Sequence, residues 1–298
     1  MDRKNFLKYI GLISAGSLLI PAQLKAFSNG PFYSLRNKTG YFVARGGTIG
    51  WYVDDDVILA VDSQFQDTAA QFVQGIFEKG SGPEKILFNT HHHGDHVGGN
   101  GVLREAGFTI IAHENVPELQ HQVAQNQGGG TPVTADKTFS EKHSISLKNE
   151  TVTAQYYGSA HTSGDSVIWF EQANIAHMGD LVFNHIYPFI DVNGGANIQG
   201  WISLLEKVMN QANKETIFIH GHTNPQYQIT GGIKDLENMH NYLSFLLEYV
   251  SKGLAEGKSA DELASISQFE AFPNHISFGE RLSLRANVLA AYGELVSD

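Results

Sequence analysis

The 298-residue chain contains no cysteine. This absence excludes disulfide bonds, a cysteine nucleophile, zinc–cysteine fingers, iron–sulfur clusters and lipid attachment through a thiol. Basic residues are also scarce, because 20 Lys and Arg stand against 31 Asp and Glu and give a formal net charge of -11. A general nucleic-acid binder needs a basic face, so this balance argues against nucleic acid as a partner.

The N-terminal apolar run is too short to cross a membrane. It extends over residues 9–20, about 12 residues, whereas a spanning helix needs about 20. It follows the positively charged segment 2–8 and precedes a small residue, Ala26. This order is typical of a secretory signal. We therefore expect an export signal at residues 1–26 and a periplasmic or secreted mature chain, 27–298, without a stable membrane anchor. The charged segment also resembles a twin-arginine signal with Lys in place of the second Arg, so both export routes stay open.

The remaining sequence alternates between strand-like and helix-like patterns, with no internal repeat and no linker between domains. Strands are expected at 41–44, 49–53, 57–61, 85–89, 108–112, 151–157, 166–170, 175–178 and 216–220. Helices are expected at 67–79, 201–211, 233–252 and 280–296. Ser259 and Glu262 match a capping box that starts a further helix, and the glycine-rich segment 128–132 predicts a flexible loop.

Histidine is unusually abundant, with 14 residues, and several of them gather in one segment. His91, His93, Asp95 and His96 form the pattern His-x-His-x-Asp-His directly after the apolar strand expected at 85–89. Sites in α/β folds favour loops at the carboxyl ends of strands. Imidazole nitrogens and carboxylate oxygens are good zinc ligands. The segment therefore predicts a metal site, and a solvated polar loop is the alternative.

This motif and three downstream elements resemble the metallo-β-lactamase-fold hydrolase superfamily. The downstream elements are Ala160-His161-Thr162, Gly179-Asp180-Leu181 and Gly221-His222-Thr223. The resemblance covers a core of about residues 40–225. It implies an α/β fold, a four-layer αββα sandwich, to which a helical C-terminal region of about residues 231–298 is added.

The resemblance also implies two zinc ions per chain. The first ion would be held by His91, His93 and His161, the second by Asp95, His96 and His222, and Asp180 would bridge them. Two divalent cations outweigh the charge of two carboxylates and a bridging hydroxide, and the remaining positive charge can stabilise an oxyanion. Asp95 is in addition the expected catalytic residue, which orients the attacking water and passes a proton to the leaving group.

Four other residues are candidates for supporting or substrate-binding roles. Asp62 ends the strand expected at 57–61 and could orient a ligand histidine or simply form a turn. His185 and Tyr187 belong to a segment that follows Asp180 and is expected at the pocket mouth, for binding or for packing. His220, next to the Gly-His pair, is a candidate for a place behind the ligands.

The function implied by the resemblance is that of a zinc-dependent hydrolase that uses metal-bound hydroxide. Its small-molecule substrate would contain an ester, thioester, lactone or amide bond, and a β-lactam is one candidate. Two alternatives on the same fold stay open: an oxidoreductase resembling persulfide dioxygenases, with one iron, and a phosphodiesterase. A binding protein that kept the fold is disfavoured, because all the expected ligands are present.

Overall fold

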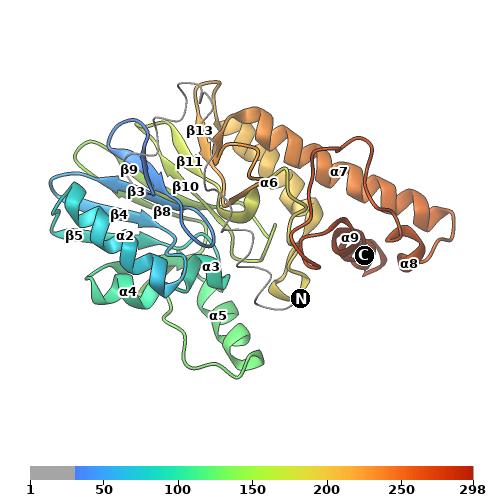
Figure 1. Cartoon of the computed structure of the whole chain (residues 1–298), viewed down its shortest axis with the longest axis horizontal. Coiled ribbons are helices and arrows are strands. Elements are labelled where there is room, and N and C mark those ends of the chain that lie inside the picture. Colours follow the sequence, from blue (N-terminus) through green and yellow to red (C-terminus); the bar gives the residue numbers. More distant parts are fainter. Residues whose placement is uncertain (1–30, 298) are drawn as a thin grey trace, which may run out of the picture. The chain divides into compact units, whose positions relative to one another are not determined.

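The N-terminal half of the chain forms a seven-stranded sheet with the strand order β1 to β7 (Figure 1). Strands β1 to β4 pair in antiparallel fashion, and β4 to β7 run parallel. The strands are β1 Phe32–Ser34, β2 Thr39–Phe42, β3 Ile49–Val53, β4 Val57–Val61, β5 Glu84–Phe88, β6 Thr109–His113 and β7 Lys137–Phe139. Parallel pairing brings the carboxyl ends of β4 and β5 to the same edge of this sheet.

The second half forms a six-stranded sheet with the order β15-β13-β11-β10-β9-β8, and β12 pairs separately with β14. Strands β11 and β13 run parallel, so the segments that follow them also emerge at one edge. The strands are β8 Lys142–Ser146, β9 Thr151–Tyr156, β10 Ser166–Phe170, β11 Ile175–His177, β12 Phe183–Asn184, β13 Ile217–Ile219, β14 His222–Thr223 and β15 Thr230–Gly231.

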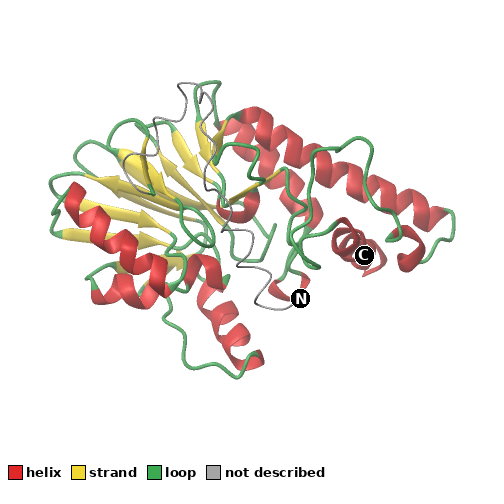
Figure 2. Cartoon of the chain, in the orientation of Figure 1, coloured by secondary structure: helices red, strands yellow, loops and turns green. Residues whose placement is uncertain are grey.

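Helices cover the outer face of both sheets, as the red ribbons on either side of the yellow strands show (Figure 2). The helices are α2 Gln66–Lys79, α3 Gly94–Val97, α4 Asn100–Glu105, α5 Asn115–Asn126, α6 Ile198–Gln211, α7 Ile233–Ala255, α8 Ala260–Leu263 and α9 Leu284–Ser297, with the short 3-10 helices η3 Gly179–Leu181 and η4 Val192–Gly194.

Three buried clusters hold these layers together. Side chains of both sheets, including Leu59 and Ile168, pack in the central cluster. Helices α2 and α4 pack on the first sheet through residues such as Phe72. Helices α6, α7 and α9 pack on the second sheet around Trp201, which is fully buried and donates its indole N–H to the carbonyl oxygen of Leu181 at 3.0 Å. The predicted four-layer αββα sandwich with added C-terminal helices is confirmed.

The computed structural model describes residues 31–297, of which those from Phe32 onward belong to one compact unit. The export signal expected at residues 1–26 lies outside the described residues and stays a prediction. Between residues 31 and 297, no helix combines the length and the apolar character that a membrane crossing requires.

The predicted elements are found with shifts of a few residues at their ends, and a few elements were not predicted. Ser259 accepts a hydrogen bond from the backbone N–H of Glu262, so the expected capping box does start α8. Helix α5 was missed because it buries little more than Val116, Leu119 and Gln120, which leaves a weak apolar pattern. Strands β7 and β8 were missed because they are short and mostly polar.

Candidate metal centre

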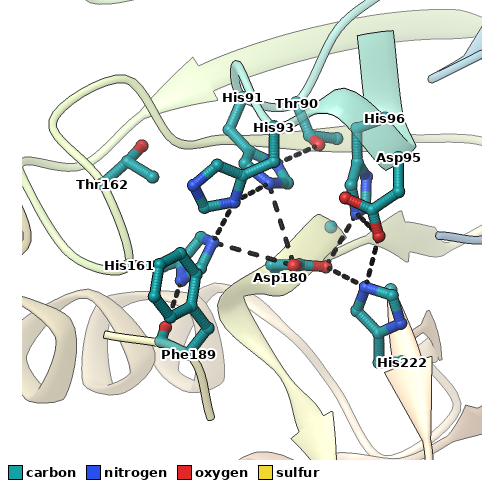
Figure 3. A network of polar contacts seen from close by, with 12 residues as sticks. Thr90, His91, His93, Asp95, His96, His161, Thr162, Asp180, Phe189 and His222 are labelled. Atoms are coloured by element: carbon teal, nitrogen blue, oxygen red, sulfur yellow. Dashed lines mark hydrogen bonds and ion pairs between the residues drawn. The ribbon is translucent and has the colours of Figure 1, made fainter. Parts of the chain in front are cut away.

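Four separate segments bring metal-capable side chains to the edge at which both sets of parallel strands end. The histidine motif, residues 91–96, follows β5 after two residues and runs into α3. His161 lies in the loop between β9 and β10. Asp180 lies in η3 directly after β11, and His222 begins β14 shortly after β13. Residues that are far apart in the sequence thus meet in one place (Figure 3).

The first donor group consists of three histidines and one oxygen of Asp180. His93 Nδ1 lies 3.1 Å from His91 Nε2 and 3.0 Å from His161 Nε2. Asp180 Oδ2 lies 3.8 Å from His91 Nε2 and 3.7 Å from His161 Nε2. All four donor atoms are within 4.8 Å of one another, and the group is largely buried.

The second donor group faces the other oxygen of the same carboxylate. Asp180 Oδ1 lies 3.0 Å from His96 Nε2 and 3.4 Å from His222 Nε2. Asp95 completes this group, because its Oδ2 lies 3.1 Å from His222 Nε2 and 3.7 Å from His96 Nε2. In Figure 3 the carboxylate of Asp180 accordingly stands between the two groups, one oxygen toward each.

The spacing of these atoms fits divalent ions. Zinc binds nitrogen and oxygen at about 2.0–2.2 Å, so neighbouring donors of a tetrahedral ion are separated by about 3.4 Å. The separations quoted above scatter around that value. His96 Nε2 and Asp180 Oδ1 are moreover buried and face each other at 3.0 Å, yet neither atom forms a hydrogen bond of acceptable geometry among the described residues. Buried polar atoms rarely lack a partner unless an ion or water completes them. The residues present therefore fit metal ions in both groups.

Hydrogen bonds behind the ligands fix the orientation of four imidazoles. Each of these rings has its outer nitrogen next to an acceptor: His91 Nδ1 is 3.0 Å from Thr90 Oγ1, His93 Nε2 is 2.9 Å from Asp191 Oδ2, His96 Nδ1 is 2.8 Å from Asp62 Oδ2, and His161 Nδ1 is 2.7 Å from the carbonyl oxygen of Phe189. A proton donated outward leaves the inner nitrogen with a free lone pair, as a metal ligand requires.

Asp62, a candidate from the sequence, lies directly behind the ligand candidate His96. It is fully buried and also accepts hydrogen bonds from the backbone N–H of Thr90 at 2.7 Å and from the Thr90 hydroxyl at 2.8 Å. Its backbone has φ 64°, in the left-handed region that side-chain-bearing residues rarely adopt. Asp62 therefore both forms the turn after β4 and contacts the imidazole of His96.

Asp191 was not singled out in the sequence, although it contacts the histidine cluster. It accepts the hydrogen bond from His93, and its Oδ2 also lies 3.4 Å from His92 Nε2. Burial opposes ionisation, yet the hydrogen bonds from both imidazoles hold the pKa of the Asp191 carboxyl well below its usual range. The only available signal was its membership of the segment after Asp180, which the sequence placed at the pocket mouth.

His185, Tyr187 and His220 do not line the cavity above the ligands. The ring of His185 stacks on Tyr227, with centroids 3.8 Å apart. Tyr187 is buried in the core that surrounds the second-sheet helices. His220 is fully buried, with Nε2 3.8 Å from Asp235 Oδ2. The structure thus brings Asp62 to the ligand candidates and leaves these three side chains away from the cavity.

The two donor groups differ in their protonation without metal. Burial, reinforced by His93, lowers the pKa of His161 to about 3, and burial together with His96 holds the pKa of His91 well below its ordinary value. The opposite holds in the second group. Burial is outweighed there by Asp180 and Asp95, which raise the pKa of His222 to about 9 and that of His96 well above its usual range. His91 and His161 of the first group are therefore neutral at neutral pH, whereas His96 and His222 of the second group are protonated.

A cavity of about 690 Å³ opens above the donor groups. This volume is typical of a small-molecule site. Its lining contains His93, Asp95, Asp180 and His222 from the candidate metal centre. Beside the centre the lining also includes His92, Gly94 and Phe183. The remaining lining residues come from α5 and the residue after it, from the segment 189–194 and from Arg281 and Leu282 of the C-terminal region.

Comparison with known proteins agrees with this architecture. The sequence model of the protein family described as the metallo-beta-lactamase superfamily matches residues 63–222. The metallo-beta-lactamase type 2 of Bacteroides fragilis is 24% identical over 162 residues, which are 54% of this chain and 60% of that protein. The metallo-beta-lactamase type 2 of Bacillus cereus is 25% identical over 166 residues, 55% of this chain and 62% of that protein. The chain thus spans about three fifths of the length of these curated relatives.

Solved structures share the fold at low sequence identity. A stereoselective inverting sec-alkylsulfatase from Pseudomonas sp. superposes with a TM-score of 0.71 at 12% identity, over 88% of this chain and 50% of that chain. A metallo-beta-lactamase from Pontibacter korlensis superposes with a TM-score of 0.56 at 18% identity, over 72% of this chain and 98% of that chain.

Metal loading is expected to stabilise the folded chain. An ion that binds only the folded state at a thousand times its dissociation constant adds about 4 kcal/mol to the free energy of unfolding. The melting temperature should therefore rise with zinc chloride and fall with a chelator, as measured by circular dichroism. A thiol reductant that does not strip metal is the control and should have no effect, because cysteine is absent. A melting temperature that ignores both zinc and chelator would contradict this expectation.

Acid should remove an ion from the second donor group before the first. A ligand imidazole with a metal-free pKa of about 9, such as His222, carries a proton at any lower pH, and the ion must displace it. Its affinity for metal therefore falls as the pH falls. His161, with a pKa of about 3, has no proton to lose in the same range. Elemental analysis after dialysis against trace zinc should give about two ions at pH 8.5 and about one at pH 5.5. Simultaneous loss of both ions would show that the assignment is wrong.

Replacing Asp191 should weaken metal binding without removing a ligand. The substitution Asp191→Ala deletes the acceptor that orients His93. Loss of such a partner typically lowers metal affinity about 10- to 100-fold, which competition with a chromophoric chelator can measure. Asp191→Asn keeps an acceptor oxygen, so its zinc affinity should fall less than that of Asp191→Ala. The matched control Asp261→Ala removes an exposed carboxylate that pairs with Arg285. Equal zinc affinity in all these variants would exclude a positioning role for Asp191.

Proposed function

The chain belongs to the metallo-β-lactamase superfamily, whose model matches more than half of it, and we propose that it is a zinc-dependent hydrolase of small molecules. It would add water across an ester, thioester, lactone or amide bond. The observation that carries this proposal is the position of Asp180, whose two carboxylate oxygens each face a complete group of nitrogen and oxygen donors.

The proposed ligand set accounts for both donor groups. One ion is assigned to His91, His93 and His161, the other to Asp95, His96 and His222, and Asp180 is shared between them. Zinc held in these positions would supply a water molecule acidified to near-neutral pKa and a Lewis acid for the substrate oxygen. Hydrogen bonds from outside the set keep the rings of His93, His96 and His161 in the required orientation.

Asp95 is the carboxylate best placed to handle protons. Its side chain is 27% exposed and lines the cavity, whereas that of Asp180 is 4% exposed. Burial would raise the pKa of Asp95, but His96 and His222 lower it to about 2, so the group is ionised at neutral pH. A carboxylate oxygen can then accept a proton from the attacking water and release it to the leaving group. The water oxygen becomes bonded to the substrate carbon, and the bond from that carbon to the leaving group breaks.

The second donor group favours this function over the alternative with one iron. A mononuclear oxidoreductase needs only the first group, and it would leave Asp95, His96 and His222 without a metal. These three residues nevertheless converge on Asp180 as closely as the first group does. Buried His96 Nε2 forms no hydrogen bond among the described residues. Two ions therefore explain more of the site than one.

A hydrolysis assay over several bond classes identifies the substrate class. The curated relatives are named as β-lactamases and a solved structural neighbour as a sec-alkylsulfatase. The zinc-loaded chain should therefore be tested against β-lactams, lactones, thioesters, carboxyl esters, phosphodiesters and sec-alkyl sulfates.

We expect turnover of at least one carbonyl substrate, with kcat/KM at least about 100-fold lower in Asp180→Asn, since that change weakens both metal positions. Asp261→Asn, on the exposed surface, is the matched control and should keep the activity. If the chain cleaves only phosphodiesters or sulfate esters, the carbonyl substrates in this proposal are wrong and the substrate class is a phosphodiester or a sulfate ester. One iron per chain in the native protein, together with no hydrolysis, would overturn the proposal.

A further inference from the structure

We propose that Arg281 binds an anionic group of the substrate, so that the chain prefers substrates in which a carboxylate stands next to an apolar body. This inference rests on the proposed hydrolase function, because Arg281 lines the cavity above the candidate metal centre. The residue lies in the C-terminal region, outside the segment that matches the family model.

Arg281 differs from the other arginines that the structure describes. Arg36 donates to the carbonyl oxygen of Glu215. The remaining three each pair with an aspartate: Arg45 with Asp67, Arg104 with Asp136 and Arg285 with Asp261. Within residues 31–297, no carboxylate or carbonyl oxygen is bonded to Arg281. Its guanidinium instead lies 5.9 Å from the ring centroid of Phe189, which also lines the cavity.

The charges around the cavity leave Arg281 available for a ligand. It is the only lysine or arginine among the lining residues. The lining carboxylates Asp95 and Asp180 face His96 and His222, and Asp191 faces His92 and His93. These acids are engaged within the candidate metal centre or directly behind it. A guanidinium that lines such a cavity suits a planar oxyanion, to which it can donate two parallel hydrogen bonds.

Backbone pairing holds this arginine at the cavity. Ile276 exchanges two hydrogen bonds with the segment after Asp180: its N–H donates to the carbonyl oxygen of His185 at 3.2 Å, and its carbonyl accepts from the N–H of Tyr187 at 3.1 Å. The chain then turns back, with the N–H of Phe278 bonded to the carbonyl oxygen of Leu282 at 2.9 Å. Gly279 adopts φ 76° in this turn. Arg281 is thus presented by a closed turn that is tied to the wall of the site.

The cavity that Arg281 lines also contains exposed apolar side chains. Val123 of α5 is 36% exposed and Val192 of η4 is 62% exposed, and both line the cavity. Phe189 and Leu282 continue this surface. Large apolar side chains that remain open around a polar centre are typical of a ligand site. The arrangement therefore fits an apolar body between two polar ends, with the scissile group over the donor groups and a carboxylate at Arg281.

The local charge matters because the chain as a whole is acidic. A formal net charge of -11 repels small anions in solution. Selection of an anionic substrate consequently depends on a few positive groups inside the cavity. Arg281 provides one of these positive groups.

The kinetic test uses a matched pair of substrates of whichever bond class the hydrolysis assay identifies, one neutral and one with an added carboxylate distal to the scissile bond. The full chain loaded with zinc should hydrolyse the anionic member with at least about tenfold higher kcat/KM. Arg281→Gln should abolish this preference, because kcat/KM for the anionic member should fall about tenfold more than kcat/KM for the neutral member. Arg281→Lys, which keeps the charge but not the planar fork, should retain part of it. Arg285→Gln, an exposed change on α9, is the matched control and should behave as the unmodified chain.

A binding measurement separates this inference from the proposed function. Benzylsuccinate carries two carboxylates on an apolar body, and phenylbutyrate carries one. Calorimetry on the zinc-loaded chain should show about tenfold weaker binding of benzylsuccinate to Arg281→Gln, with phenylbutyrate unchanged. The difference should shrink as salt is added. If the unmodified chain and Arg281→Gln bind benzylsuccinate with equal affinity, the proposed anion-binding role of Arg281 is overturned, whatever the hydrolysis assay gives. The two proposals can also separate in the other direction. If Arg281→Gln binds benzylsuccinate more weakly but the unmodified chain hydrolyses none of the substrates, the anion site is supported and the proposed hydrolase function is overturned.

Discussion

The buried carboxylate of Asp180 is the group on which the rest of the site depends. It is 4% exposed, and each of its oxygens faces a different set of donors. Burial alone would favour the neutral acid, but His222 and His96 hold the pKa of Asp180 well below its ordinary range. A single negative charge thus organises both groups. It also links the segment after β11 to the histidine motif after β5, and these two strands belong to different sheets.

That relationship is secured by bonds on the far side of the imidazoles. Asp62 follows β4 of the first sheet and holds His96, whereas the segment after η3 supplies Asp191 to His93 and the carbonyl of Phe189 to His161. The first half of the sandwich therefore fixes His96 and, through Thr90, His91, whereas the second half fixes His93 and His161. A shift between the sheets would disturb ring orientation before it broke any strand, because a metal ligand tolerates small errors poorly. The packing of the two sheets against each other therefore also sets the orientation of the ligand candidates.

Local residue chemistry made part of this arrangement predictable from the sequence. The donors at 91–96 stand close together after an apolar strand, and Asp62 is visible because it ends a strand, so both attract notice without any knowledge of tertiary contacts. Asp191 and Arg281 carry no comparable local pattern. The relevance of Asp191 comes from a hydrogen bond to His93, which is 98 residues away. Helix α5 forms a cavity wall although its apolar pattern is weak, because tertiary packing outweighs periodicity there.

The division of labour along the chain follows from the same distinction. Residues 63–222, which match the family model, contain every donor of the candidate metal centre. Donors must satisfy fixed distances to an ion, so this part of the structure has little freedom to vary. The turn that carries Arg281 is subject to no such requirement, since it needs only the backbone bonds between Ile276 and the segment after Asp180. A helical extension packed against the second sheet can therefore change what the cavity recognises while the bond-breaking centre stays the same.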